Sequence, residues 1–68
     1  MNPSNASGYQ LRYRSLFHSG RGFAFPCDVR GRVDLDALSE RARNNYLYAR
    51  AVVGRELDLP AVEPTWLQ

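Results

Sequence analysis

The feature that most constrains the fold is an alternation of side-chain character in the first half of the chain. Between residues 9 and 17 the odd positions are aromatic or apolar apart from one serine, whereas most even positions are polar. The same parity returns over residues 23–29, after a turn that contains two glycines. A period of two is typical of a β-strand with one buried face. The pattern therefore predicts two antiparallel strands joined as a β-hairpin.

The register of this hairpin follows from the need to keep both apolar sets on one face, because a slip of one residue would turn one set over. The shortest register that satisfies this condition places His18 opposite Gly22, across a three-residue loop. It also places Arg12 opposite Asp28 as a cross-strand ion pair. Because Pro26 has no N–H, strand two should be an edge strand, and a second hairpin would extend the sheet through strand one.

A single long helix is predicted over residues 35–53. Asp34 is its expected N-cap, and Gly54 marks its end. The residues that should cover the hairpin recur at steps of three and four and are Leu35, Leu38, Ala42, Tyr46, Ala49 and Val53. The second half of the helix is apolar nearly all round, which is more apolar surface than one hairpin can cover.

These elements predict an α+β fold, a small ββα unit in which an antiparallel β-hairpin packs on one long helix with an extended C-terminal tail. We expect residues 1–8 to be disordered and residues 9–54 to form the ββα domain. Residues 55–68 contain two prolines and should form an extended tail that packs on the helix or on a partner subunit.

The chain has sixty-eight residues, which is enough for one domain of marginal stability. Cys27 is the only cysteine and His18 the only histidine, so one chain can build neither a disulfide framework nor a Cys/His zinc site. No metal or cofactor is predicted. The sequence also lacks an apolar stretch that would span a membrane and a recognisable signal peptide, so we expect a cytoplasmic protein with no membrane partner.

Candidate catalytic groups are few. Cys27 falls on the aromatic face of strand two, where a buried thiol is expected, and His18 in the hairpin loop lies too far along the strand to activate it. Asp34 and Asp36 lie on different sides of the helix start, which does not make a carboxylate pair. We therefore predict that the protein is not an enzyme, and an enzyme that uses Cys27 is the least favoured alternative.

Two arginine-glycine turns were considered as phosphate sites, because backbone N–H groups in such turns can hold an anion. They are Gly20-Arg21-Gly22 and Arg30-Gly31-Arg32. Asp34 is expected to cap the N–H groups that follow the second turn and would repel a phosphate. The glycine spacing and the lysine of a P-loop are also missing, so no nucleotide site is predicted.

The excess apolar surface on the helix favours a small non-enzymatic interaction or accessory protein that acts as a homodimer, or that binds another protein. The expected dimer or tail interface consists of Leu47, Tyr48, Ala51, Val52 and Trp66.

The alternative is a nucleic-acid-binding module or small regulator. All nine basic residues are arginine, and the formal charge is +4 over residues 1–32 and −2 over residues 33–68. The arginines that a hairpin face would present to nucleic acid are Arg12, Arg14, Arg21, Arg30 and Arg32.

Overall fold

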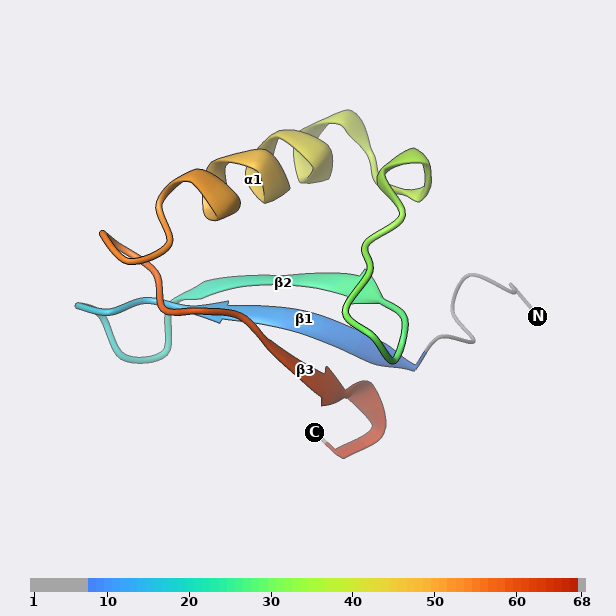
Figure 1. Cartoon of the computed structure of the whole chain (residues 1–68), viewed down its shortest axis with the longest axis horizontal. Coiled ribbons are helices and arrows are strands. Elements are labelled where there is room, and N and C mark those ends of the chain that lie inside the picture. Colours follow the sequence, from blue (N-terminus) through green and yellow to red (C-terminus); the bar gives the residue numbers. More distant parts are fainter. Residues whose placement is uncertain (1–7, 68) are drawn as a thin grey trace.

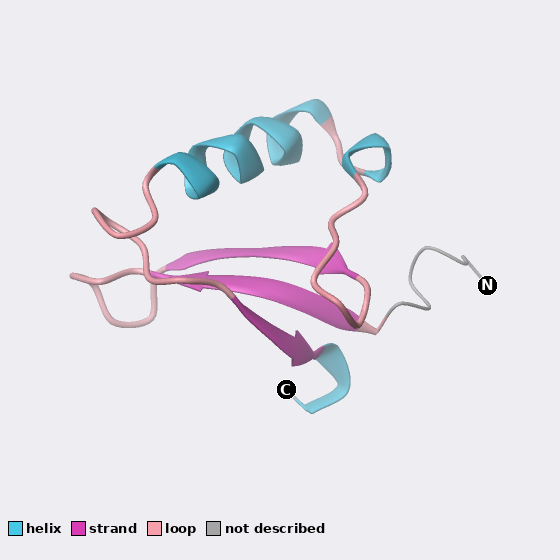
Figure 2. Ribbon diagram, viewed as in Figure 1, coloured by secondary structure: helices cyan, strands magenta, loops and turns pink. Residues whose placement is uncertain are grey.

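The computed structural model describes residues 8–67, in which one α-helix lies over a three-stranded antiparallel sheet (Figures 1 and 2). The elements in chain order are β1 (Tyr9–Arg14), β2 (Gly22–Cys27), the 3-10 helix η2 (Leu35–Ala37), α1 (Glu40–Ala51), β3 (Ala61–Pro64) and the 3-10 helix η3 (Thr65–Leu67). The predicted α+β class with a β-hairpin and one α-helix is confirmed. The expected disorder of residues 1–8 lies outside the described residues, apart from Gly8.

The central strand of the sheet is β1, and its neighbours are β2 on one side and β3 on the other. β2 is an edge strand, as Pro26 predicts. The other edge of β1 was predicted to be the easier one for any extension of the sheet by a second hairpin, but it is not free. The chain's own tail occupies that edge as β3, with Tyr9 opposite Pro64 and Arg12 opposite Ala61.

Proline also interrupts the free edge of each outer strand. The N–H of Ser15 donates to the carbonyl oxygen of Arg21 at 2.9 Å, so odd-numbered residues of β2 bond to β1 and Pro26 faces outward. On the other side, the N–H of Thr65 donates to the carbonyl oxygen of Gly8 at 2.8 Å. The same alternation turns Pro64 outward on β3, so each edge lacks one donor that an added strand would need.

The predicted hairpin register is wrong, although its parity is right. Tyr9 lies opposite Cys27 and Arg12 lies opposite Ala24, so Arg12 does not face Asp28. The strands end earlier than expected because Ser15 opens the loop. Its hydroxyl oxygen accepts hydrogen bonds from the N–H of Phe17 at 3.2 Å and of His18 at 3.0 Å. Such a local turn competes with the strand ladder, and residues 15–21 become the loop.

The predicted single helix over residues 35–53 is also wrong in its extent. Leu38 and Ser39 are extended, so η2 and α1 are separate. The Ser39 hydroxyl accepts a hydrogen bond from the N–H of Ala42 at 3.1 Å and is the N-cap of α1. Asp34 caps η2 instead, through the N–H of Asp36 at 3.0 Å.

The core lies between α1 and the sheet. Its buried members come from β1, β2, α1 and the segment that leads into β3, and they are Leu11, Tyr13, Phe25, Cys27, Ala49, Val52 and Leu57. Phe25 makes edge-to-face contacts with Tyr13 and with Tyr46, at centroid distances of 6.0 and 5.2 Å. The aromatic face predicted from the parity of the strands is thus the face that α1 covers.

Gly22 should be the glycine least tolerant of replacement. It has a φ of 143°, and a Cβ there would collide with the carbonyl oxygen of Tyr13. Gly20 has a φ of 83° with open space around it, so it provides a matched control. We expect Gly20→Ala to lower the free energy of unfolding by about 1 kcal/mol. Gly22→Ala should lower it by clearly more, as measured by urea denaturation, and equal losses would contradict this account of the loop.

Candidate functional site

The thiol of Cys27 does not have the properties of a nucleophile. Cys27 is only 3% exposed. Burial raises the pKa of the thiol, and the nearby charge of Asp28 adds to this effect. His18 lies in the β1–β2 loop, at the opposite end of β2 from Cys27. A buried, protonated thiol without a base suits a packing role.

Within residues 8–67, no three His, Cys, Asp or Glu residues are grouped so that they could hold a metal ion. The helices in this range are too short and too polar to cross a membrane.

The second arginine-glycine turn already holds an anion, namely the carboxylate of Asp28. One of its oxygens accepts hydrogen bonds from the N–H groups of Arg32 at 2.8 Å and Arg30 at 2.9 Å. These two hydrogen bonds lower the pKa of the Asp28 carboxyl group, and the bond from Arg32 has the larger effect. Asp34 was predicted to repel a phosphate at this turn, but the carboxylate that occupies the N–H groups of the turn is that of Asp28. An Asp at the end of a strand before Gly31 is a known signal for an Asx-type turn.

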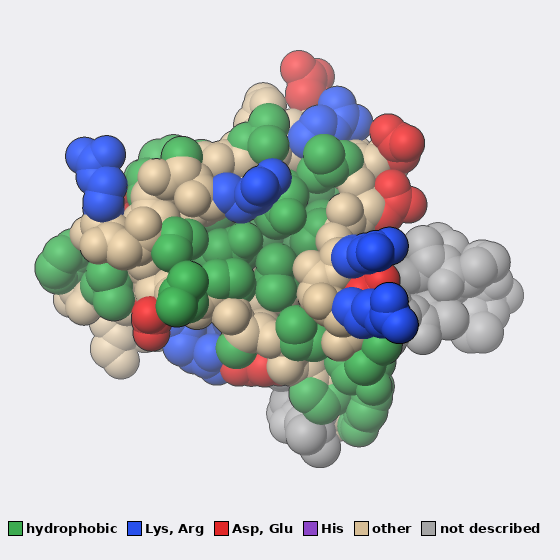
Figure 3. Space-filling view, viewed as in Figure 1, with side chains coloured by type: hydrophobic (Ala, Val, Ile, Leu, Met, Phe, Trp, Pro, Cys, Tyr) green, Lys and Arg blue, Asp and Glu red, His purple; other side chains and the backbone are tan. Residues whose placement is uncertain are grey.

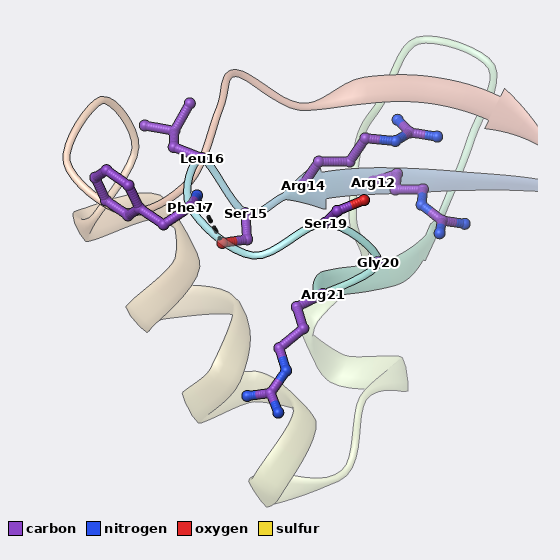
Figure 4. Close-up of a pocket in the computed structure, with 8 residues that line it drawn as sticks. All are labelled: Arg12, Arg14, Ser15, Leu16, Phe17, Ser19, Gly20 and Arg21. Atoms are coloured by element: carbon purple, nitrogen blue, oxygen red, sulfur yellow. Dashed lines mark hydrogen bonds between the residues drawn. The ribbon is translucent and has the colours of Figure 1, made fainter.

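A basic hollow lies at the β1–β2 loop, which bends away from α1 (Figures 1 and 4). It has a volume of about 460 Å³ and is lined by Arg12, Arg14 and Arg21 together with residues 15–17, 19 and 20. Arg12 and Arg14 project from the face of β1 opposite the core, and Arg21 belongs to the loop. We use the name basic hollow for this set below.

One of the three arginines is paired. A guanidinium nitrogen of Arg14 lies 2.7 Å from a carboxylate oxygen of Glu63 on β3. This hydrogen bond lowers the pKa of the Glu63 carboxyl group and raises that of Arg14. Arg12 and Arg21 form no ion pair within residues 8–67. They add positive charge to the basic hollow, and the charge of Arg12 also contributes to the lowered pKa of the Glu63 carboxyl group.

The five arginines predicted as nucleic-acid contacts do not form one ribbon. Arg30 and Arg32 follow the C-terminal end of β2, whereas Arg14 and Arg21 flank its other end. A strand of six residues separates the two groups by roughly 17 Å. The basic hollow therefore contains three of the predicted residues and excludes two.

The five predicted interface residues are also divided. Leu47, Tyr48 and Ala51 are exposed on α1. Val52 is buried in the chain's own core. Trp66 is exposed beyond β3, where its ring lies edge-on to Tyr9 at a centroid distance of 5.2 Å.

Phe17 and Val29 do not lie on the buried face, where parity placed them, and Val29 is 63% exposed. Phe17 lies in the loop and is 71% exposed. Its ring lies at the opposite end of the basic hollow from the guanidinium groups of Arg12 and Arg14 (Figure 4). Ser15 was the available signal, because a serine hydroxyl can accept hydrogen bonds from backbone N–H groups two and three residues further on, as it does here from Phe17 and His18.

Comparison of the chain with protein-family models, with curated proteins and with solved structures found no match.

Cys27 should react with a thiol reagent only when the fold opens. We expect slow labelling of the native protein by an aromatic disulfide reagent, because the thiol is buried, and rapid labelling in concentrated urea. The measurement is the rate of thiolate release in the two conditions. Rapid labelling of the native protein would show that the thiol is accessible.

Acid should weaken the fold partly through Asp28. Because its pKa is lower in the folded state, its stabilising effect is present above its unfolded value, near pH 4, and is lost as the pH falls through the folded value. Asp28→Asn should therefore reduce stability at neutral pH and flatten its decline in acid. Urea denaturation at a series of pH values measures this, and part of the decline should remain because the pKa of Glu63 is also lowered. Parallel curves would contradict the role of Asp28.

Proposed function

We propose that this chain is a small non-enzymatic interaction protein that acts as a homodimer through the solvent-facing side of α1. We call this side the outer face, and its residues are Glu40, Asn44, Leu47, Tyr48 and Ala51. Tyr48 lies at its edge, because its ring is also edge-on to Phe23 of β2 at a centroid distance of 6.2 Å and its hydroxyl donates to Glu56 at 2.9 Å. The observation that carries the proposal is apolar exposure on the outer face. Leu47 and Tyr48 are 48% and 47% exposed, although the chain buries only seven apolar residues in its described core.

The spacing of the outer face suits helix packing. At 100° per residue, Asn44 and Ala51 form its midline, and Leu47 and Tyr48 stand on either side. The midline lies opposite Ala49, which is completely buried. Small side chains on the midline allow close approach of a second helix, while the two larger side chains fill the space beside it.

A second copy is the partner that fits this face best. An antiparallel pair with its twofold axis between Leu47 and Tyr48 brings each Leu47 beside the other copy's Tyr48. The same axis brings Glu40, at the start of α1, toward Arg55 of the other copy, just beyond the end of the helix. Both residues are exposed and form no ion pair within residues 8–67. In this arrangement the two ends of the face would be complementary in charge.

Exposed apolar side chains are not confined to α1. In the space-filling view they also occupy the region between the helix and the sheet (Figure 3). Large apolar patches of this kind are typical of proteins that associate. Because both sheet edges are interrupted by proline, association through a face is favoured over sheet extension.

The proposal predicts that Leu47→Asp dissociates the dimer without unfolding it. A carboxylate at the centre of the interface would be desolvated without a partner, whereas Leu47 contributes little to the core of one chain. Val29→Asp is the matched control, because Val29 is 63% exposed and lies outside the outer face. Light scattering after gel filtration should give a dimer for the wild type and the control and a monomer for Leu47→Asp. A monomeric wild type would contradict the proposal.

Charge reversal tests the antiparallel arrangement. Glu40→Arg and Arg55→Glu should each weaken the dimer, and the double variant should restore it because the pair is rebuilt with opposite signs. Dissociation constants from sedimentation measure the effect. If the double variant is weaker than either single variant, the two residues do not meet across the interface.

A further inference from the structure

The basic hollow combines two chemical groups that the core and the outer face do not use. Arg12 and Arg21 provide positive charge without an ion-pair partner within residues 8–67. Phe17 provides an aromatic ring that is 71% exposed. Its backbone is held by the hydrogen bond from its N–H to the Ser15 hydroxyl, at 3.2 Å. The ring is therefore presented to solvent on a loop with a defined turn.

The arrangement suits an extended anion more than a single phosphate. The guanidinium groups of Arg12, Arg14 and Arg21 point in different directions instead of toward one point (Figure 4). A second hollow of about 150 Å³ shares Arg12 and Arg21 and continues to Ala24 on β2. Positive charge is thus spread along a surface, as a chain of phosphates would require.

We propose that the basic hollow binds single-stranded nucleic acid, with backbone phosphates at Arg12 and Arg21 and one base stacked on Phe17. Exposed aromatic rings beside a basic groove are the elements that hold unpaired bases without reading their sequence. A duplex would not present an unstacked base to Phe17. The single strand is therefore favoured over double-stranded DNA.

Glu63 should act against this binding. Its carboxylate neutralises Arg14 at 2.7 Å and places a negative charge at the rim of the basic hollow. Removing that charge would release Arg14 for a phosphate and remove a repulsion. A binding site for an anion thus predicts a gain of affinity in Glu63→Gln, which a purely structural role of the pair would not produce.

This inference does not depend on the proposed dimer. Arg12 projects from the face of the sheet opposite α1, whereas Leu47 and Ala51 of the outer face are exposed on α1. A dimer formed through α1 would therefore leave the Arg12 side of the basic hollow accessible in both copies. Variants of one surface can therefore be tested without changing the other.

The experiment is fluorescence anisotropy of a labelled single-stranded oligodeoxythymidine, titrated with the full-length protein over a range of salt concentrations. We expect binding that weakens as salt rises, with a logarithmic slope of about −1.4 for two phosphate contacts. Arg12→Ala combined with Arg21→Ala should abolish most of the binding. Phe17→Ala should weaken it by about 5-fold or more, Phe17→Tyr should keep it, and Glu63→Gln should strengthen it.

The matched control is Arg30→Ala combined with Arg32→Ala, which removes the same charge at the other end of β2. It should weaken binding clearly less than the Arg12 and Arg21 pair. Circular dichroism checks that each variant keeps its fold. The proposal is overturned if the wild type does not bind at low ionic strength, or if the two arginine pairs have equal effects. It is also overturned if a duplex of the same length binds as tightly and Phe17→Ala has no effect.

Discussion

The antiparallel pairing of β3 with β1 is the contact on which the other features of this small fold depend. It moves β1 from an edge to the centre of the sheet, with Tyr9 opposite Pro64. The segment that leads into β3 carries Leu57, which is buried beside the core residues of β1 and α1. The pairing also brings Glu63 to Arg14, so it determines which arginine of the basic hollow is neutralised. A hairpin and helix alone would lack the central position of β1, the buried Leu57 and the ion pair between Arg14 and Glu63.

Much of the fold could be predicted because burial follows a simple parity. The aromatic face and the α+β class depend on which side of each strand is apolar, and the alternation of residues in the sequence shows this. The edge position of β2 follows from Pro26, which has no N–H. The register and the helix boundaries depend on single hydrogen bonds. Ser15, Asp28 and Ser39 each bind nearby N–H groups. Ser15 and Asp28 end strands that periodicity alone would continue, and Ser39 begins α1 later than periodicity predicts.

The strand β3 could not be predicted from its own residues. It has four residues and ends in Pro64, so it has neither the length nor the composition of a typical strand. Only the tertiary contact with β1 makes it a strand. The candidate sites show the same limit. Arg12, Arg14 and Arg21 come together because the loop bends, and Phe17 is exposed because the loop is longer than parity predicted.

The prolines at the two sheet edges have a consequence for how far this protein can assemble. Open strand edges permit growth without end, since each added chain presents a new edge to the next. Here Pro26 and Pro64 remove a backbone donor from the outer side of β2 and of β3. Contacts through faces related by a twofold axis close on themselves after two chains. Association through the proposed α1 interface would therefore give an assembly of finite size.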